Sequence, residues 1–197
     1  FPTRRSSDLR PIKIVSTGKY LPKRISSNDL ENKLSIPIGW CERYSGVKYR
    51  HHATTETNGL MGAKAAEQAL KKANFKLNDI DFLISASGSY DYPIPNQGSV
   101  IKSLMKDGNQ ADLAAIHIDS TCLSFVAAFE IAAKILDGNK MKNILIVSSE
   151  ISSKALNENN WETATLFGDG AAAVILQYDE SGSSNFIKGT QKTYSKG

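Results

Sequence analysis

Short apolar runs set the strongest limit on how this chain folds. Four of them have the length of a strand and lie at 82–86 (FLISA), 114–118 (AAIHI), 143–148 (NILIVS) and 171–176 (AAAVIL). A further strand is predicted at 12–17 (IKIVST). Because apolar residues follow one another without alternation, we expect cover on both faces, as in a parallel sheet, with 82–86 and 114–118 as buried neighbours.

Segments with helical periodicity separate these runs. Helices are predicted at 28–34, 57–74 and 97–106 and after Cys122, and residues 46–52 are predicted to be extended. Ser26 or Ser27 is expected to cap the first helix. The helix after Cys122 is expected to end at Asp137-Gly138 and to place five apolar residues on one face: Phe125, Phe129, Ala132, Ala133 and Leu136. This order of elements predicts an α/β fold with a mostly parallel sheet covered by helices.

Cys122 lies between a predicted strand and a predicted helix. At the first turn of a helix, unpaired N–H groups and the helix dipole stabilise a thiolate, and the same groups can receive the oxyanion that forms when sulfur attacks a carbonyl. The position therefore favours a nucleophile, although a lone cysteine is more often an inert core residue. A base would have to be a histidine, and His117 is instead expected to be a strand residue held by a backbone carbonyl.

The stretch LFGDGAAAVIL at 166–176 carries two glycines around an aspartate. It matches neither phosphate-binding loop pattern, so phosphate binding is not expected. We interpret Gly168, Asp169 and Gly170 as a structural turn. The glycines would allow a positive φ or the close approach of two segments, and Asp169 would accept hydrogen bonds from backbone donors in the turn.

Composition excludes several classes of protein. The chain has 197 residues, 41% of them hydrophobic, and a net charge of +4, which fits one or two ordinary domains. No apolar run reaches the length of a membrane span and no secretory leader opens the chain, so we expect a cytoplasmic protein without a span. No basic stripe with interleaved aromatic residues indicates nucleic-acid binding. Cys41 with His51 and His52 lacks the paired spacing of a zinc site, so no metal is expected.

The opening residues 1–9 (FPTRRSSDL) have no apolar periodicity. They correspond to one reading frame of a sequencing-adaptor oligonucleotide, so we interpret them as a non-native scar and residues 10–197 as the domain.

From residue 12 onward the chain resembles the β-ketoacyl-ACP synthase III group of thiolase-fold condensing enzymes. The resemblance rests on Cys122 between strand and helix, on LFGDGAAA after it, and on STGKYLP, SGVKYRHHA, YPIPNQGSVIKSLM and SSEI in order. It implies two similar α/β halves, a homodimer, and an acyltransferase in which Cys122 is acylated. A malonyl-ACP-type extender is then decarboxylated, and its carbanion attacks the acyl-cysteine to give a β-ketoacyl thioester.

The resemblance also implies binding residues. Trp40, with Arg43 and Arg50, is placed at the coenzyme-binding position, and Ile94, Leu166 and Phe167 are placed at the acyl pocket. Coenzyme A or acyl-carrier-protein thioesters would be substrates, acyl carrier protein a partner, and no cofactor would be bound permanently.

The chain departs from the family in four places. Tyr44 and Trp161 stand where arginines that contact the coenzyme are expected, Ile94 replaces a large aromatic ring, and His117 replaces an aspartate. The resemblance covers the N-terminal half only, so the family's catalytic histidine and asparagine lie outside the chain and we expect it to be inactive by itself. Three alternatives remain: a thioester-condensing enzyme from a pathway other than fatty-acid synthesis, a catalytically silent partner subunit, and a cysteine hydrolase.

Overall fold

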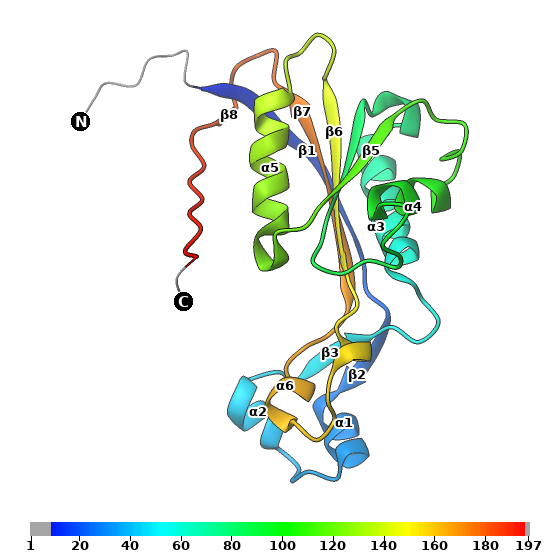
Figure 1. Ribbon diagram of the computed structural model, residues 1–197, viewed down its shortest axis with the longest axis vertical. Helices are drawn as coiled ribbons and strands as arrows, with labels where there is room; N and C mark the ends of the chain where they lie inside the picture. The colour runs from blue at the N-terminus through cyan, green and yellow to red at the C-terminus, as the bar shows by residue number, and fades with distance from the viewer. Residues whose placement is uncertain (1–8, 196–197) are drawn as a thin grey trace, which may run out of the picture.

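A six-stranded sheet forms the centre of the computed structural model, which describes residues 9–195 (Figure 1). The strand order is β5-β4-β6-β7-β1-β8. The bounds are β1 Arg10–Tyr20, β4 Phe82–Ala86, β5 Ala114–Ile118, β6 Asn143–Glu150, β7 Gly170–Tyr178 and β8 Asn185–Phe186. The predicted scar lies, apart from Leu9, outside the described residues.

Four of the six strands run in the same direction. β4 pairs in parallel with β5 and with β6, whereas β7 pairs antiparallel with both β6 and β1. β1 is therefore parallel to β6 across β7, and β8 runs antiparallel beside β1. The predicted α/β fold with a mostly parallel sheet is confirmed, and β7 is the antiparallel strand inside it.

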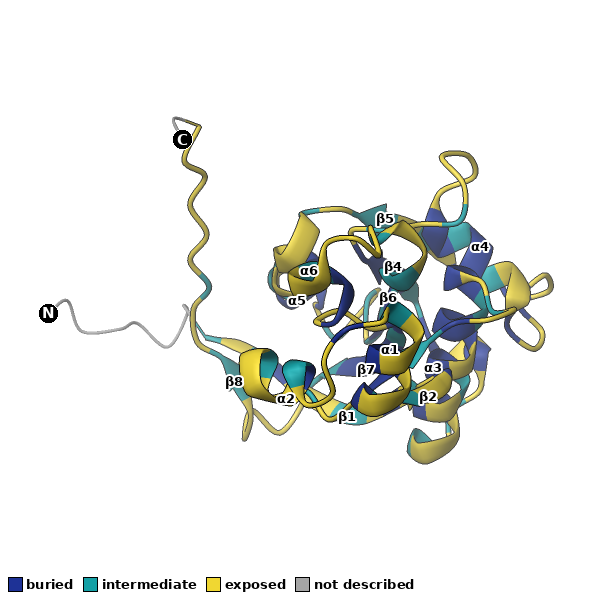
Figure 2. Ribbon diagram, turned by 90° about the horizontal axis from the view of Figure 1, so that it is seen from below, coloured by how far each residue is buried: buried dark blue, intermediate teal, exposed yellow. Residues whose placement is uncertain are grey.

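Helices cover the two faces of the sheet because successive side chains of a strand point to opposite sides. On β6, Leu145 and Val147 face the core that contains α3, whereas Ile144 and Ile146 face the core that contains α5. α3 (Asn58–Ala73) and α4 (Gln97–Leu104) lie on one side and α5 (Ser124–Ile135) on the other. Figure 2 shows the buried residues concentrated in the strands and on the inner sides of α3 and α4.

The helix ends follow their capping residues. Ser26 caps α1 (Ser27–Leu34), as predicted, because its Oγ accepts the N–H of Asp29 at 3.0 Å. Thr57 caps α3 in the same way, and Asn74 ends that helix in the left-handed conformation. Short 3₁₀ turns occupy Leu77–Asp79, Thr121–Leu123 and Ser153–Ala155.

A small lobe lies below the sheet in Figure 1. It contains the antiparallel pair of strands β2 (Lys23–Ser26) and β3 (Tyr49–His52), together with α1, α2 (Trp40–Ser45) and α6 (Trp161–Ala164). The predicted extension at 46–52 is therefore a strand only from Tyr49 onward.

One burial prediction is wrong. β5 neighbours β4 as predicted, but it is an edge strand, and Ala114 and Ile116 are exposed. Phe125 shares a face of α5 with Phe129, since their ring centroids lie 5.9 Å apart, but Phe125 is 42% exposed at the end of that face.

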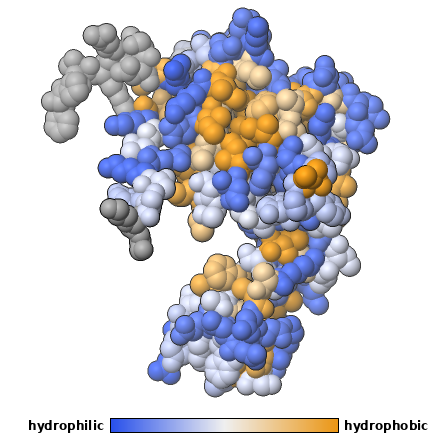
Figure 3. Space-filling model, viewed as in Figure 1, coloured by the Kyte–Doolittle hydropathy of each residue, from blue (hydrophilic) through white to orange (hydrophobic). Residues whose placement is uncertain are grey.

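The face that carries α5 remains partly open. Ile14 of β1 is 57% exposed, and Phe125, Val126 and Ile131 of α5 are also exposed. An apolar cavity of about 530 Å³ opens between Ile14, Phe125 and Val174. In Figure 3 apolar side chains gather in the upper part of the molecule, over α5 and the strands beside it. No helix in the described part of the chain is long and apolar enough to span a membrane.

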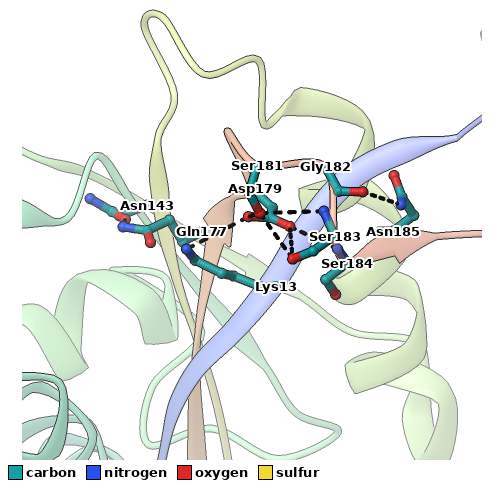
Figure 4. A network of polar contacts seen from close by, with 9 residues as sticks. All are labelled: Lys13, Asn143, Gln177, Asp179, Ser181, Gly182, Ser183, Ser184 and Asn185. Atoms are coloured by element: carbon teal, nitrogen blue, oxygen red, sulfur yellow. Dashed lines mark hydrogen bonds and ion pairs between the residues drawn. The ribbon is translucent and has the colours of Figure 1, made fainter.

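A polar network closes the turn between β7 and β8 (Figure 4). The buried Asp179 carboxylate accepts the N–H of Ser184 at 2.7 Å and the hydroxyls of Ser181 and Ser183, and Lys13 of β1 lies 3.7 Å from it. These hydrogen bonds lower the pKa of Asp179 to about 2. The network thereby fixes β8, and with it Phe186, against the start of β1.

Candidate active site

Three parallel strands end at the same edge of the sheet. Gly88 and Ser89 follow β4, Cys122 follows β5, and Glu150 is the last residue of β6. In α/β sheets the carboxyl ends of parallel strands are where ligands bind. The sheet order β5-β4-β6 thus brings together three segments that lie far apart in the sequence.

Cys122 lies in the 3₁₀ turn Thr121–Leu123, which leads directly into α5. It is exposed and not in a disulfide. The structure places it two residues before the first residue of α5, rather than within the first turn of that helix. No side chain caps this end of α5, so the backbone N–H groups there lack a side-chain acceptor. The N–H groups of Leu123 and Ser124 donate to the carbonyls of Ser120 and Thr121 in this turn. The exposed thiol can attack a carbonyl.

The residue before Cys122 has an unusual backbone. Thr121 has a φ of 50°, a left-handed conformation that is rare for a β-branched residue and costs about 1–3 kcal/mol. Local hydrogen bonds hold it: Asp119 accepts the N–H of Thr121 at 2.8 Å, and Ser124 donates its hydroxyl to the carbonyl of Thr121 at 2.7 Å. The turn that presents the thiol is therefore fixed by its own neighbours.

His117 is the histidine nearest to Cys122 in sequence. Its Nδ1 lies 3.2 Å from the Ser85 hydroxyl, and its buried Nε2 has no partner among the described residues. A hydrogen bond to the backbone of Ser85 also acts on His117, in line with the predicted backbone partner. Burial lowers the pKa of His117, although the carboxylates of Asp119 and Glu150 act against this shift. A neutral His117 is expected at neutral pH, and none of its hydrogen bonds reaches Cys122.

The glycine-flanked aspartate joins separate segments. Asp169 accepts the N–H of Ala53 at 2.6 Å and both the N–H and the hydroxyl of Ser153, at 2.8 and 2.6 Å. The donors thus come from distant segments and not from the turn, because the turn packs against β3. A Cβ on Gly168 would lie 3.1 Å from the carbonyl oxygen of His51. The close approach of these two backbone segments therefore explains why residue 168 is a glycine. Neither Gly168 nor Gly170 has a positive φ.

The small lobe carries an aromatic cluster. Trp40 stacks on Tyr44 with ring centroids 4.7 Å apart and meets Trp161 edge to face at 6.2 Å. The Arg43 guanidinium lies 5.7 Å from the Tyr44 ring. The structure therefore brings Trp40 and Arg43 together, and Tyr44 covers one face of the indole.

Arg50 does not reach this cluster through any hydrogen bond. It is 4% exposed, and its Nη2 donates to the carbonyl of Thr165 at 2.6 Å and to the Ser27 hydroxyl at 3.2 Å. The guanidinium joins α1 to the end of α6, and its Nε and Nη1 have no partner among the described residues.

Sequence reasoning missed the buried Glu31 beside Trp40. Its carboxylate accepts the N–H groups of Gly39 and Cys41 at 2.8 and 2.7 Å. Burial would raise the pKa of Glu31, but these hydrogen bonds outweigh it and hold the pKa below its usual range. Burial also raises the pKa of the fully buried Cys41. Within residues 9–195, no cluster of histidine, cysteine and acidic side chains is arranged to hold a metal ion.

The predicted acyl-pocket residues are all on the surface. Ile94 is 88% exposed, Leu166 47% and Phe167 45%. Their assignment to an acyl pocket stays a prediction.

Comparisons with known proteins agree with this arrangement. Residues 116–195 match the family described as 3-oxoacyl-[acyl-carrier-protein (ACP)] synthase III. The chain is 36% identical over 170 residues to beta-ketoacyl-[acyl-carrier-protein] synthase III of Actinobacillus pleuropneumoniae, and the match covers 85% of this chain and 53% of that protein. The Haemophilus influenzae protein of the same name is 34% identical, with the same shares covered.

A solved structure shows the same fold. The crystal structure of 3-oxoacyl-[acyl-carrier-protein] synthase III from Aquifex aeolicus VF5 superimposes with a TM-score of 0.79 at 31% identity, over 86% of this chain and 54% of that one. The chain thus spans about half the length of the curated relatives it matches. In its sheet and in the turn that presents Cys122, the chain is similar to members of the 3-oxoacyl-[acyl-carrier-protein] synthase III family, whose model matches residues 116–195.

Proposed function

We propose that Cys122 is the nucleophile of an acyltransferase that makes a β-ketoacyl thioester by decarboxylative Claisen condensation, in a protein as long as its relatives. The observation that carries the proposal is the exposed thiol in the fixed turn before an uncapped helix, at the carboxyl ends of three parallel strands. The names of the relatives support the same chemistry.

The first half-reaction moves an acyl group onto Cys122. The Cys122 thiolate attacks the carbonyl carbon of an acyl thioester, and backbone N–H groups beside Cys122 would receive the negative oxygen. The donor sulfur leaves as a thiol after it takes up the proton that Cys122 lost. The C–S bond to the donor breaks as the C–S bond to Cys122 forms, and no oxidant or reductant is needed.

The second half-reaction transfers the acyl group from Cys122 to the carbanion of the extender. A malonyl thioester on acyl carrier protein loses CO₂, the carbanion attacks the acyl carbonyl, and the Cys122 sulfur is the leaving group. Resemblance places the histidine and asparagine that assist decarboxylation outside this chain, so the chain by itself is expected to be inactive.

The substrates and partners follow from the same proposal. Coenzyme A or carrier-protein thioesters would supply the acyl group, Trp40 and Arg43 would contact the carrier portion, and Ile94, Leu166 and Phe167 would border the acyl chain. Acyl carrier protein, a homodimer and a cytoplasmic location complete the proposal. The exposed positions of these side chains are consistent with surfaces covered by substrate or by a second subunit.

Labelling tests the nucleophile directly. Full-length protein is incubated with radiolabelled acyl thioesters and the modified peptide is mapped by mass spectrometry. We expect the label on Cys122 and none on Cys41, which is fully buried. We expect Cys122→Ser to lose condensation by at least about a hundredfold, while decarboxylation of the malonyl thioester continues.

Four outcomes would change the assignment. Label on Cys41, or undiminished condensation by Cys122→Ser, would remove Cys122 from the mechanism. Hydrolysis of the acyl thioester without condensation would favour a cysteine hydrolase. Absence of acyl label on Cys122 of the wild-type protein would favour a silent partner subunit.

A further inference from the structure

Glu150 connects the end of β6 to the segment that follows β4. Its Oε1 accepts the N–H of Gly88 at 2.6 Å, and its Oε2 accepts the hydroxyl of Ser89. The hydroxyl oxygen of Ser89 also accepts the side-chain amide of Asn58 at 2.7 Å, from the first turn of α3. The carboxylate therefore fixes residues 88–89 to β6, and the Asn58 amide fixes Ser89 to α3.

Residues 88–89 in turn form a wall beside the turn that carries Cys122. A Cβ placed on Gly88 would lie 3.4 Å from Cα of Thr121 and 3.8 Å from Oε1 of Glu150. Thr121 is the residue in the left-handed conformation. The backbone of Gly88 thus fills the space between the Glu150 carboxylate and the residue that sets the direction of Cys122.

The hydrogen bonds within the turn do not hold Thr121 on the side that faces Gly88. Asp119 and Ser124 hold Thr121 from within the segment 119–124 itself. Gly88, in the segment that follows β4, lies against Thr121 from outside the turn. The Glu150 carboxylate fixes Gly88 by accepting its N–H.

We infer that Glu150 is a positioning residue for Cys122. By fixing Gly88 and Ser89 against Thr121, it keeps the Cys122 side chain in the orientation that acyl transfer requires. The inference rests on the proposed role of Cys122 as the nucleophile. Glu150 itself takes no part in bond making, and its effect passes through the backbone at residues 88 and 121.

The test compares Glu150→Ala, Glu150→Gln and Ser89→Ala in full-length protein. Alanine removes both acceptors, and glutamine keeps one oxygen for the Gly88 N–H. Ser89→Ala keeps the carboxylate and its bond to Gly88 but removes the hydroxyl, which donates to Glu150 and accepts from Asn58 and Ile151. Glu180→Gln is the control, because Glu180 is exposed and follows β7 at the opposite end of the sheet. Each variant is checked by its thermal unfolding midpoint.

Two readouts are measured on folded protein. The first is the rate at which iodoacetamide alkylates Cys122, and the second is kcat and KM for acyl transfer. Because small misplacements of a reacting group cost up to about a hundredfold, we expect Glu150→Ala to lower kcat by about 10- to 100-fold with little change in KM. The alkylation rate should fall as well, Glu150→Gln should restore part of both losses, and Glu180→Gln should match the wild type.

The outcomes separate this inference from the proposed function. A Glu150→Ala protein that folds and keeps both the alkylation rate and kcat within about twofold of the wild type would overturn the positioning role. If Glu150→Ala fails to fold, the same comparison is made with Ser89→Ala, for which unchanged rates would overturn it. If wild-type Cys122 is never acylated but its alkylation still depends on Glu150, the proposed function fails and the positioning role stands.

Discussion

The two faces of the sheet are covered to different extents. On the face of α3, an alanine-rich helix lies against β1 and β7, and α4 covers β4 and β5 beside it. Gly18 permits the contact, because a Cβ there would overlap the carbonyl oxygen of Ala65 and lie 2.6 Å from the nitrogen of Ala69. The hydroxyl of Ser16 donates to the carbonyl of Ala69 at 2.7 Å. This face is closed within the chain.

On the opposite face a single helix covers only part of the sheet. Ile12 of β1 is 4% exposed beneath α5 and β8, but Ile14, on the same side of the same strand, is 57% exposed. The apolar cavity beside Ile14 and Phe125 begins one helical turn after Cys122. Contiguous apolar surface of this kind indicates that another structure covers it.

The difference shows which face of the sheet this chain covers with its own side chains. The α3 face needs only its own side chains, whereas the α5 face holds the candidate nucleophile and lacks cover. The half-length match to the relatives agrees with an α5 face that a further part of a longer protein would cover.

The largest effect is expected from a substitution on the closed face. Gly18→Ala should destabilise the chain by at least about 3 kcal/mol, because the new methyl group would meet backbone atoms that cannot move independently. Chemical denaturation monitored by circular dichroism measures the change.

Gly170→Ala is the matched control for that substitution. A Cβ at Gly170, also in a strand, would lie 3.3 Å from the flexible end of Leu21, so a smaller loss is expected. Equal stability of the two variants would show that α3 does not pack closely on β1.

Much of this fold was predictable from local pattern. The runs 82–86 and 114–118 are strands with the predicted bounds, and Thr57 and Ser26 cap helices because capping depends on neighbouring residues. The exposure of β5 was not predictable, since an apolar run does not show whether its strand lies at the centre or the edge of the sheet.

The candidate site was predictable only in part. The place of Cys122 between a strand and a helix is a local feature. The contacts of Gly88 and Glu150 depend on the strand order β5-β4-β6, and the donors to Asp169 come from residues 53 and 153. Such long-range pairing leaves no periodic signal in the sequence.

A second prediction compares two isoleucines of β1. In this chain Ile12→Ala should cost about 2–5 kcal/mol, because it opens a cavity in a packed core, whereas Ile14→Ala should change stability by about 0.5 kcal/mol or less. In the full-length protein Ile14→Ala should cost as much as Ile12→Ala. Denaturant unfolding of both variants in both lengths measures this. A neutral Ile14→Ala in the full-length protein would mean that the α5 face stays open.

The smallest expected effect is a loss of stability at low pH in the turn between β7 and β8, which borders the α5 face. The hydrogen bonds from Ser184 and Ser181 hold the pKa of Asp179 at about 2, below its ordinary value of 3.8. A carboxyl group with a lowered pKa in the folded state stabilises the fold above pH 3.8, and this contribution is lost as the pH falls toward 2. The turn that Asp179 holds carries Phe186, whose ring lies 6.0 Å from that of Phe129 in α5.

Acidification should therefore loosen the open face before the closed one. Between pH 5 and pH 2.5, hydrogen exchange should rise more at residues 184–186 and in α5 than in α3, and the thermal midpoint should fall. Asp179→Asn cannot ionise, so its midpoint should start lower and fall less over the same range, whereas Asp112→Asn, at an exposed position, should follow the wild type. Equal acid sensitivity of Asp179→Asn and the wild type would show that the Asp179 network does not support this edge.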